Sequence, residues 1–374
     1  MKNNQLNYLQ RMAALATATC AMLLLSACSK PDSGAVTQAS QQSYEWKLVT
    51  SWPKNFPGLG RAPETFAKEV ARMSNGRLKI KVYGDGELVP GFEVFDAVSG
   101  GTAQMGHAAG YYWKGKAPAA QIFTTIPFGM NAQETNGWFH YGGGLELWRE
   151  VYEPFGLIPF AGGNTGVQMA GWFKKEINSL EDIKGLKMRI PGLGGEVLKK
   201  LGGIPIALTG GDLFTSLQSG AIDATEWVGP YNDLAFGLYK ASDYYYYSGW
   251  HEPGAALEFI VNKAAYEQLP QDLQAIIEVA TRAVNQDMLD EYTARNNEAM
   301  QTLKNKHNVI MRPLPADVMQ GLRQASLEVM AEQSAADPVF KKVYDSYRAF
   351  QTKVSEYHQI SEFEYYKNRS GTEN

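Results

Sequence analysis

The chain has 374 residues, 44% hydrophobic and 20% charged, which is the composition of a folded globular protein, and its length predicts two lobes. The net charge of −4 argues against a general nucleic-acid-binding protein, which would present a basic face. A mean hydropathy of −0.31 excludes a polytopic membrane protein.

The amino terminus is predicted to be a targeting signal. Lys2 and Arg11 form a short basic region, and an uncharged stretch then runs to Ala27. This stretch is short for a membrane span and suits a signal peptide over residues 1–27. It ends in Leu25-Ser26-Ala27-Cys28, which resembles the bacterial lipobox, whose cysteine becomes the lipidated first residue. Ordinary secretory cleavage beside a chance cysteine is the alternative, but the small residues before Cys28 favour a lipoprotein.

Residues 28–43 are mostly small and polar and are predicted to be a flexible tether. The other cysteine, Cys20, lies within the signal, so the predicted folded body has no cysteine for a disulfide or a metal site. Removing residues 1–27 removes two positive charges, which leaves a mature net charge of −6. We therefore expect an exported, periplasmic or otherwise extracytoplasmic protein that is anchored through lipidated Cys28.

Residues 44–164 are predicted to form the first lobe, with later segments returning to it. The segment 78–83 alternates apolar and other side chains with the period of a half-buried strand, and Phe66, Val70 and Met73 recur at helical spacing. In chain order, the pattern predicts strand, helix, strand and short helix at residues 44–50, 63–73, 78–83 and 92–98. This order indicates a mostly parallel sheet covered by helices.

Residues 165–262 repeat this organisation and are predicted to form the second lobe. Strands are expected at residues 167–173, 186–190 and 221–227, and short helices at 196–201 and 212–219. Two α/β units in one chain predict two lobes with a cleft between them. Ligands of open α/β sheets bind beyond the carboxyl ends of the strands, so side chains at these ends are the first candidates for a site.

Residues 263–374 are predicted to be a helical region that packs on and bridges both lobes. A long amphipathic helix is marked by apolar residues at helical spacing, Leu273, Ile277, Ala280, Val284 and Met288. Helical spacing returns over residues 318–330 and, after Pro338, over the aromatic-rich stretch 339–357. Packing on its own lobe is the simpler interpretation of this last stretch, and a partner surface is the alternative.

The sequence contains no Walker A, HExxH or GxSxG motif. Gly192-Leu-Gly194-Gly195-Glu-Val197 lies between a predicted strand and helix, but Val197 occupies the third glycine position of a dinucleotide motif, so a tight turn explains it better. The five histidines are never three or four residues apart, so a helix-borne imidazole metal pair is absent. Nucleophilic and zinc chemistry thus lack support, while catalysis by dispersed carboxylates stays open.

Four polar residues lie in or at the ends of apolar segments, where burial is costly. Arg189 precedes Ile190-Pro191 at a predicted strand end, where a guanidinium could bind a carboxylate through two parallel hydrogen bonds. A structural ion pair is an equally good interpretation of Arg189. Gln168, Glu226 and Glu252 offer oxygen atoms that could bind a hard cation such as Ca²⁺ or Na⁺. Each of these three taken alone could also be a hydrogen-bonded core residue.

The combined pattern resembles the extracytoplasmic solute receptors of TRAP transporters, from Trp46 to about Arg369. The matching segments begin at Thr50-Ser-Trp-Pro-Lys-Asn, Ser179-Leu-Glu-Asp-Ile-Lys and Leu213-Phe-Thr-Ser-Leu-Gln. The Gln168 segment, Glu226-Trp-Val-Gly-Pro-Tyr231 and Tyr245-Tyr-Tyr-Ser-Gly-Trp250 resemble the branch that binds 2-oxo and 2-hydroxy monocarboxylates with a metal ion. The resemblance implies a two-lobed α/β fold like that of class II periplasmic binding proteins, with a long bridging helix and a helical C-terminal region.

The same resemblance implies residues that contact the substrate. Arg189 would bind the ligand carboxylate, and Gln168 and Trp227 would also lie at the ligand. Tyr111 or Tyr112 of the first lobe would hydrogen-bond the ligand, and the sequence does not decide which of them faces the cleft.

The resemblance also implies a set of metal ligands. Gln168, Glu226, the backbone carbonyl of Trp227 and Glu252 would bind a cation, Ca²⁺ or Na⁺, and oxygens of the carboxylate substrate would complete its coordination. The cation and Arg189 together would let an acidic protein bind an anion.

These inferences predict a receptor that passes a small monocarboxylate to TRAP membrane permease subunits. An exported metal-dependent enzyme acting on a 2-oxo acid is one alternative, and a ligand-sensing lipoprotein is another. The missing nucleophile, zinc and redox-cofactor motifs argue against the enzyme. A homodimer formed through the C-terminal helix stays open, and no nucleic-acid partner is expected.

Overall fold

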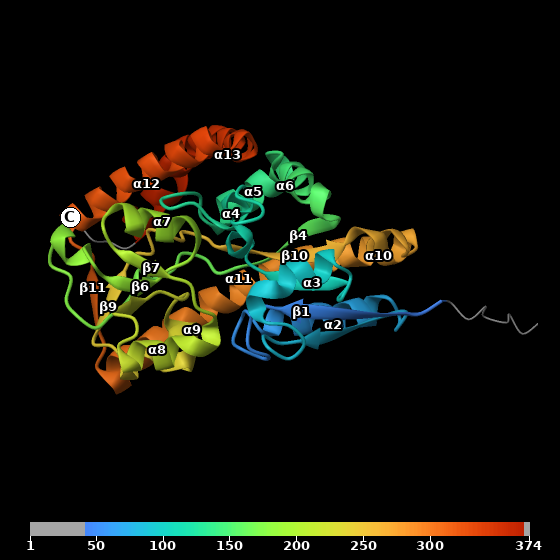
Figure 1. The fold of residues 1–374 in the computed structure, drawn as a ribbon, viewed down its shortest axis with the longest axis horizontal. Helices are drawn as coiled ribbons and strands as arrows, with labels where there is room; N and C mark the ends of the chain where they lie inside the picture. The colour runs from blue at the N-terminus through green and yellow to red at the C-terminus, as the bar shows by residue number, and fades with distance from the viewer. Residues whose placement is uncertain (1–41, 370–374) are drawn as a thin grey trace, which may run out of the picture. The chain divides into compact units, whose positions relative to one another are not determined.

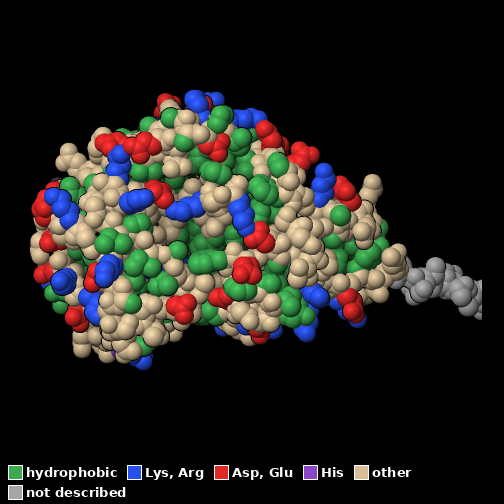
Figure 2. Space-filling view, in the orientation of Figure 1, with side chains coloured by type: hydrophobic (Ala, Val, Ile, Leu, Met, Phe, Trp, Pro, Cys, Tyr) green, Lys and Arg blue, Asp and Glu red, His purple; other side chains and the backbone are tan. Residues whose placement is uncertain are grey.

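The computed structural model describes residues 42–369, and residues 43–369 belong to one compact unit (Figure 1). The predicted signal peptide and most of the predicted tether, including Cys28, lie outside the described residues. Within the described part of the chain, none of the helices is both long enough and apolar enough to cross a membrane. On the face in Figure 2, acidic and basic side chains are interspersed rather than gathered into one basic area.

The first sheet has five strands in the order β2-β1-β3-β10-β4. Its strands are β1 (Tyr44–Thr50), β2 (Leu78–Tyr83), β3 (Met105–Ala108), β4 (Leu157–Asn164) and β10 (Ala256–Asn262). Strand β1 is parallel to β2 and β3, whereas β10 is antiparallel to β3 and β4. In β2, Leu78 and Val82 are buried and the lysines are exposed, as the period of two predicts. The expected mostly parallel sheet is therefore mixed.

The second sheet has six strands in the order β11-β9-β5-β8-β6-β7. They are β5 (Gly171–Phe173), β6 (Lys187–Arg189), β7 (Ile204–Ile206), β8 (Ala224–Thr225), β9 (Tyr244–Tyr247) and β11 (Ile310–Pro313). Strand β6 is parallel to β7 and β8, while β5 is antiparallel to β8 and β9. Strands β5 and β8 are shorter than predicted. Gln168 and Glu226, which were expected within these strands, lie just outside them and belong to the site described below.

Two strands pair with segments outside the predicted range in which they lie. Strand β10 falls within the predicted second lobe, 165–262, but pairs in the first sheet, and β11 falls within the predicted helical region, 263–374, but pairs with β9 in the second sheet. Both pairings join segments far apart in the chain, for which hydrophobic periodicity gives no signal.

The helices that follow the strands of the first sheet lie between residues 61 and 152, with one more after β10. They are α2 (Arg61–Met73), α3 (Val94–Ser99), α4 (Ala120–Thr124), α5 (Ala132–Tyr141), α6 (Gly144–Tyr152) and α10 (Lys263–Glu267). Asn131 and Glu134 form a capping box that starts α5. The rings of Phe123 and Trp148 stack at 5.1 Å between centroids and join α4 to α6.

The second sheet is accompanied by α7 (Gly192–Lys200), α8 (Leu213–Ser219) and α9 (Pro230–Phe236). Helix α7 was expected to begin at residue 196 but begins four residues earlier, although glycine is a poor helix former. The glycines permit close packing: a Cβ atom on Gly194 would lie 3.0 Å from Ile190 and 3.1 Å from His251, and one on Gly195 would lie 2.8 Å from the Ile190 carbonyl. The sequence that resembles a dinucleotide loop is therefore a packing contact.

The C-terminal third consists of long helices, as predicted. They are α11 (Gln271–His307), α12 (Ala316–Ala336), α13 (Pro338–His358) and, after a π-helical turn (Gln359–Phe363), α14 (Glu364–Arg369). Helix α11 buries its predicted apolar stripe and contacts β4 and α2 of the first lobe and α9 of the second, so it bridges the lobes. Asn308, at φ 54°, ends α11, and Asp337 caps the start of α13.

Candidate functional site

The candidate site is built at the carboxyl ends of two parallel strands of the second sheet. Arg189 is the last residue of β6, and Glu226 directly follows β8. The Glu226 backbone amide donates to the Arg189 carbonyl at 3.3 Å, which places the two side chains next to each other. Both residues thus lie at carboxyl ends of strands, where ligands of open α/β sheets bind.

Arg189 is buried, and every nitrogen of its guanidinium has a partner. Nη1 contacts the Glu226 carboxylate and donates to the Glu226 carbonyl at 3.3 Å, and Nε donates to the Leu208 carbonyl at 3.2 Å. The guanidinium carbon lies 4.8 Å from the ring centroid of Trp227, a cation–π distance. Burial disfavours the charged form of Arg189, but Glu226, Tyr112, Tyr111 and Glu252 together outweigh this effect and raise the pKa of the guanidinium.

A second buried carboxylate lies beside this pair. Glu252 is 3% exposed and accepts a hydrogen bond of 2.6 Å from Nε2 of Gln168. Burial raises the pKa of Glu252 well above its usual value, and the negative charge of Glu226 adds to the effect. Arg189 opposes this shift, but one guanidinium faces two carboxylates here. The local charge would be balanced by one further cation.

The donor atoms fit a metal ion. Glu226, His251 and Glu252 each offer a ligand atom, and these atoms lie within 4.8 Å of one another. Nε2 of Gln168 is held by Glu252 and by Thr165 Oγ1, at 3.0 Å, while its Oε1 is buried without a partner. An unpaired buried carbonyl oxygen next to two carboxylates is a donor set suited to Ca²⁺ or Na⁺.

Sequence reasoning missed His251. Its Nε2 lies 3.2 Å from the second carboxylate oxygen of Glu226, and its Nδ1 is buried without a partner. Glu226 is thus held on one oxygen by Arg189 and on the other by His251. The search for paired histidines on a helix could not find this residue, because it reaches the site from a loop; its position next to Glu252 was the available signal.

Both candidate tyrosines border the site, on a 3₁₀ turn (Gly110–Trp113) that follows β3. The Tyr112 hydroxyl accepts a long hydrogen bond of 3.5 Å from Arg189, and burial raises its pKa to about 12. Tyr111 packs against Gly192, whose φ is 58° and where a Cβ atom would lie 2.9 Å from the Tyr111 Cβ. A hydrogen bond from Tyr111 acts to lower the pKa of Glu252. Tyr112 therefore lies nearer the guanidinium and Tyr111 nearer the second carboxylate.

A cavity opens onto Arg189, Gln168 and the two tyrosines, with about 260 Å³ of space that includes the part open to solvent. Thr165 completes its polar lining. Its apolar lining includes Trp52 and Leu257 of the first lobe and Trp227 and Val228 of the second. Both lobes thus contribute, and the lining suits a small molecule with one charged end and one apolar end.

Comparison with known proteins identifies the family. The family described as bacterial extracellular solute-binding protein, family 7, matches residues 48–337. The chain belongs to this family. The resemblance to TRAP solute receptors is thereby confirmed, and the functional class of family 7 is solute binding.

Relatives cover nearly the whole chain. A protein from Nostoc sp. named monocarboxylate 2-oxoacid-binding periplasmic protein is 44% identical over 353 residues, which is 94% of this chain and 95% of the relative. The crystal structure of a TRAP periplasmic solute-binding protein from Colwellia psychrerythraea with bound calcium and pyruvate is 47% identical, with a TM-score of 0.85, and covers 87% of this chain and 100% of its own. A second, from Pseudoalteromonas atlantica with bound sodium and pyruvate, is 44% identical, with a TM-score of 0.86, and covers 89% and 100%. These similarities confirm the predicted α/β fold of TRAP solute receptors.

Proposed function

We propose that this family 7 protein is the solute-binding receptor of a TRAP transporter, which binds a small 2-oxo or 2-hydroxy monocarboxylate together with a cation and delivers it to the membrane permease. One observation carries the proposal: buried Arg189 and Gln168 line one small cavity between the lobes, and each of them contacts a buried carboxylate, Glu226 and Glu252 respectively, while Oε1 of Gln168 has no partner. The similarity to pyruvate-binding structures that hold calcium or sodium supports the same ligand class.

The carboxylate of the ligand would bind to Arg189. In the structure, the Glu226 carboxylate contacts Nη1 of Arg189, a position that a substrate carboxylate could also take. A cation bound by Glu226 would draw this carboxylate away from the guanidinium and leave it open to the substrate. Tyr111 and Tyr112 would donate hydrogen bonds to the ligand, because their raised pKa values keep both hydroxyls protonated.

The cation would be held by Gln168 Oε1, Glu226, Glu252 and the backbone carbonyl of Trp227. When bound, it supplies positive charge between the protein carboxylates and the anionic ligand. His251 would keep Glu226 oriented toward it through the contact at 3.2 Å. Substrate and cation would thus favour each other's binding, and contacts from both lobes would stabilise a closed form of the cleft.

The proposal includes where the protein acts and what it contacts. It would work in the periplasm, tethered to a membrane by lipid on Cys28, which mass spectrometry of membrane-extracted protein would test.

The end of α13 and the segment after it expose apolar side chains, Tyr357, Ile360, Phe363, Tyr365 and Tyr366. This segment is the proposed contact of a homodimer, and removal of residues 359–374 is expected to give a monomer by light scattering.

Calorimetry of cation-stripped protein tests the ligand class. We expect pyruvate, lactate or a longer 2-oxo acid to bind when Ca²⁺ or Na⁺ is restored, and succinate to bind much more weakly. Failure of every monocarboxylate to bind under any cation condition would refute the proposal.

A further inference from the structure

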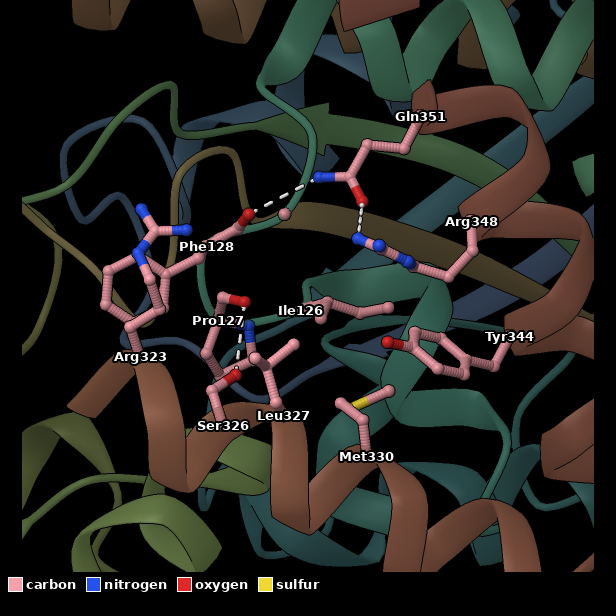
Figure 3. A pocket seen from close by; sticks show the side chains of 11 residues that line it. Ile126, Pro127, Phe128, Arg323, Ser326, Leu327, Met330, Tyr344, Arg348 and Gln351 are labelled. Carbon is pink, nitrogen blue, oxygen red and sulfur yellow. Dashed lines mark hydrogen bonds between the residues drawn. The ribbon is translucent and has the colours of Figure 1, made fainter. Parts of the chain in front are cut away.

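A second cavity lies away from the ligand site, between α12, α13 and the loop that joins α4 to α5 (Figure 3). The space among its lining residues is about 370 Å³ when the part open to solvent is included, and it shares no lining residue with the cavity between the lobes. The Phe128 amide of this loop donates to the carbonyl of Trp250, the residue before His251, at 2.7 Å. Nothing in the proposed transport mechanism uses this second cavity.

The charged side chains of its lining are both cationic. Arg323 enters from α12 and Arg348 from α13, and the lining contains no carboxylate. Acidic residues on the same two helices are engaged elsewhere: Glu328 pairs with Lys200 at 3.1 Å and Asp345 with Lys341 at 2.5 Å. In a chain whose net charge is −4, two arginines without a lining carboxylate make this cavity locally positive.

Both guanidinium groups are held in place. The Arg323 guanidinium lies over the ring of Phe128, 4.5 Å from its centroid. Arg348 donates to Gln351 Oε1 at 2.8 Å, and Gln351 in turn donates to the Phe128 carbonyl at 3.3 Å (Figure 3). Because these contacts already restrict the two arginine side chains, less side-chain conformational entropy is lost when an anion binds.

The rest of the lining is suited to a small apolar group. Ile126, Leu327 and Met330 contribute aliphatic side chains, and Tyr344 adds a half-buried ring. Burial raises the pKa of Tyr344, so its hydroxyl is protonated and can donate to an anion. Figure 3 shows Met330 and Tyr344 on the same side of the cavity. The cavity therefore combines two cations and one neutral donor with an apolar surface.

We propose that this cavity binds a small organic anion, a carboxylate joined to a compact apolar body, independently of the ligand in the cleft. The carboxylate contacts Arg323 and Arg348, and the apolar body lies against Met330 and Leu327. Carboxylate–guanidinium hydrogen bonds are charge-assisted and directional, which favours a carboxylate over a halide ion.

The test uses the mature chain and 4-fluorobenzoate as the probe, followed by fluorine NMR. Excess Ca²⁺ and pyruvate are present throughout, so that the cleft is occupied. We expect saturable binding that further pyruvate does not displace. Absence of saturable binding, or loss of the bound probe when more pyruvate is added, would overturn the proposal.

Three variants locate the binding. Arg323→Gln/Arg348→Gln is expected to weaken probe binding at least about tenfold, and Leu327→Trp, which fills the cavity from a half-exposed position, by a similar factor. Arg72→Gln/Arg295→Gln removes two exposed arginines on other helices and is expected to leave binding unchanged. Unchanged binding in the Arg323→Gln/Arg348→Gln variant would contradict the proposal even if Leu327→Trp failed to fold.

Discussion

Replacing Arg189 by methionine tests whether the buried ion pair is the centre of the ligand site. The variant removes a guanidinium whose side chain is 2% exposed and leaves Glu226, whose side chain is 1% exposed, without it. Removing one partner of a buried pair typically costs about 3–5 kcal/mol, because the other charge stays desolvated. The Leu208 and Glu226 carbonyls also lose donors at 3.2 and 3.3 Å, which adds to the cost.

We therefore expect cation-free Arg189→Met to be less stable than the wild type by about 3–5 kcal/mol in urea unfolding. The double variant Arg189→Met/Glu226→Gln is the matched control, because it removes both charges and should recover most of the loss. A single variant that unfolds at the same urea concentration and with the same m-value as the wild type would refute this description of the pair.

The same variant tests ligand binding. Without the guanidinium, the substrate carboxylate would be desolvated with no partner, which costs about 2–5 kcal/mol of binding energy. This corresponds to an affinity loss of roughly 30-fold to several thousand-fold in calorimetry. Unchanged affinity in a folded variant would show that another group binds the carboxylate.

Three further predictions concern the neighbouring polar groups. His251→Phe should weaken Ca²⁺ binding about 10- to 100-fold, whereas His251→Gln, which keeps a donor near Glu226, should retain most of the affinity in calcium titrations; equal losses would contradict a positioning role. Gln168→Leu should weaken Ca²⁺ binding at least about tenfold, because the unpaired Oε1 is lost, and unchanged affinity would exclude this oxygen as a ligand. Burial raises the pKa of Glu258 to about 7. Between pH 4.5 and 7, Glu258 therefore stays protonated in the folded protein, whereas it has lost its proton in the unfolded chain. The free energy of unfolding should fall as the pH rises through this range. In urea unfolding, the free energy of unfolding should fall less between pH 5 and pH 8 in Glu258→Gln than in the wild type, by up to about 3 kcal/mol. An identical pH dependence in the two proteins would show that Glu258 is not the group responsible.

The sequence located the main groups of the site because chemistry and position agreed there. Arg189 and Glu226 lie at ends of parallel strands, and a buried charge at such a place requires a partner. The two interpretations of Arg189, a group that binds the ligand carboxylate and a partner in a structural ion pair, are compatible with each other. Glu226 contacts the guanidinium in the structure, and the proposed cation would draw the Glu226 carboxylate away from it.

Other features could not be derived from the sequence, because they depend on contacts between distant segments. The membership of β10 in the first sheet is set by pairing with β3 and β4, and α7 begins at Gly192 because Ile190 and His251 pack against its glycines. The aromatic stretch of α13 divides between both interpretations: Phe340, Val343 and Tyr347 are buried on their own lobe, while Tyr357 is 64% exposed.

The most direct test of the account is the affinity of the stripped protein for Ca²⁺, measured with and without saturating pyruvate. A shared site requires that each ligand change the affinity for the other by the same factor. We expect pyruvate to tighten Ca²⁺ binding at least about tenfold, and Ca²⁺ to tighten pyruvate binding equally. Identical Ca²⁺ affinities in the two titrations would contradict the central claim that cation and carboxylate are bound together.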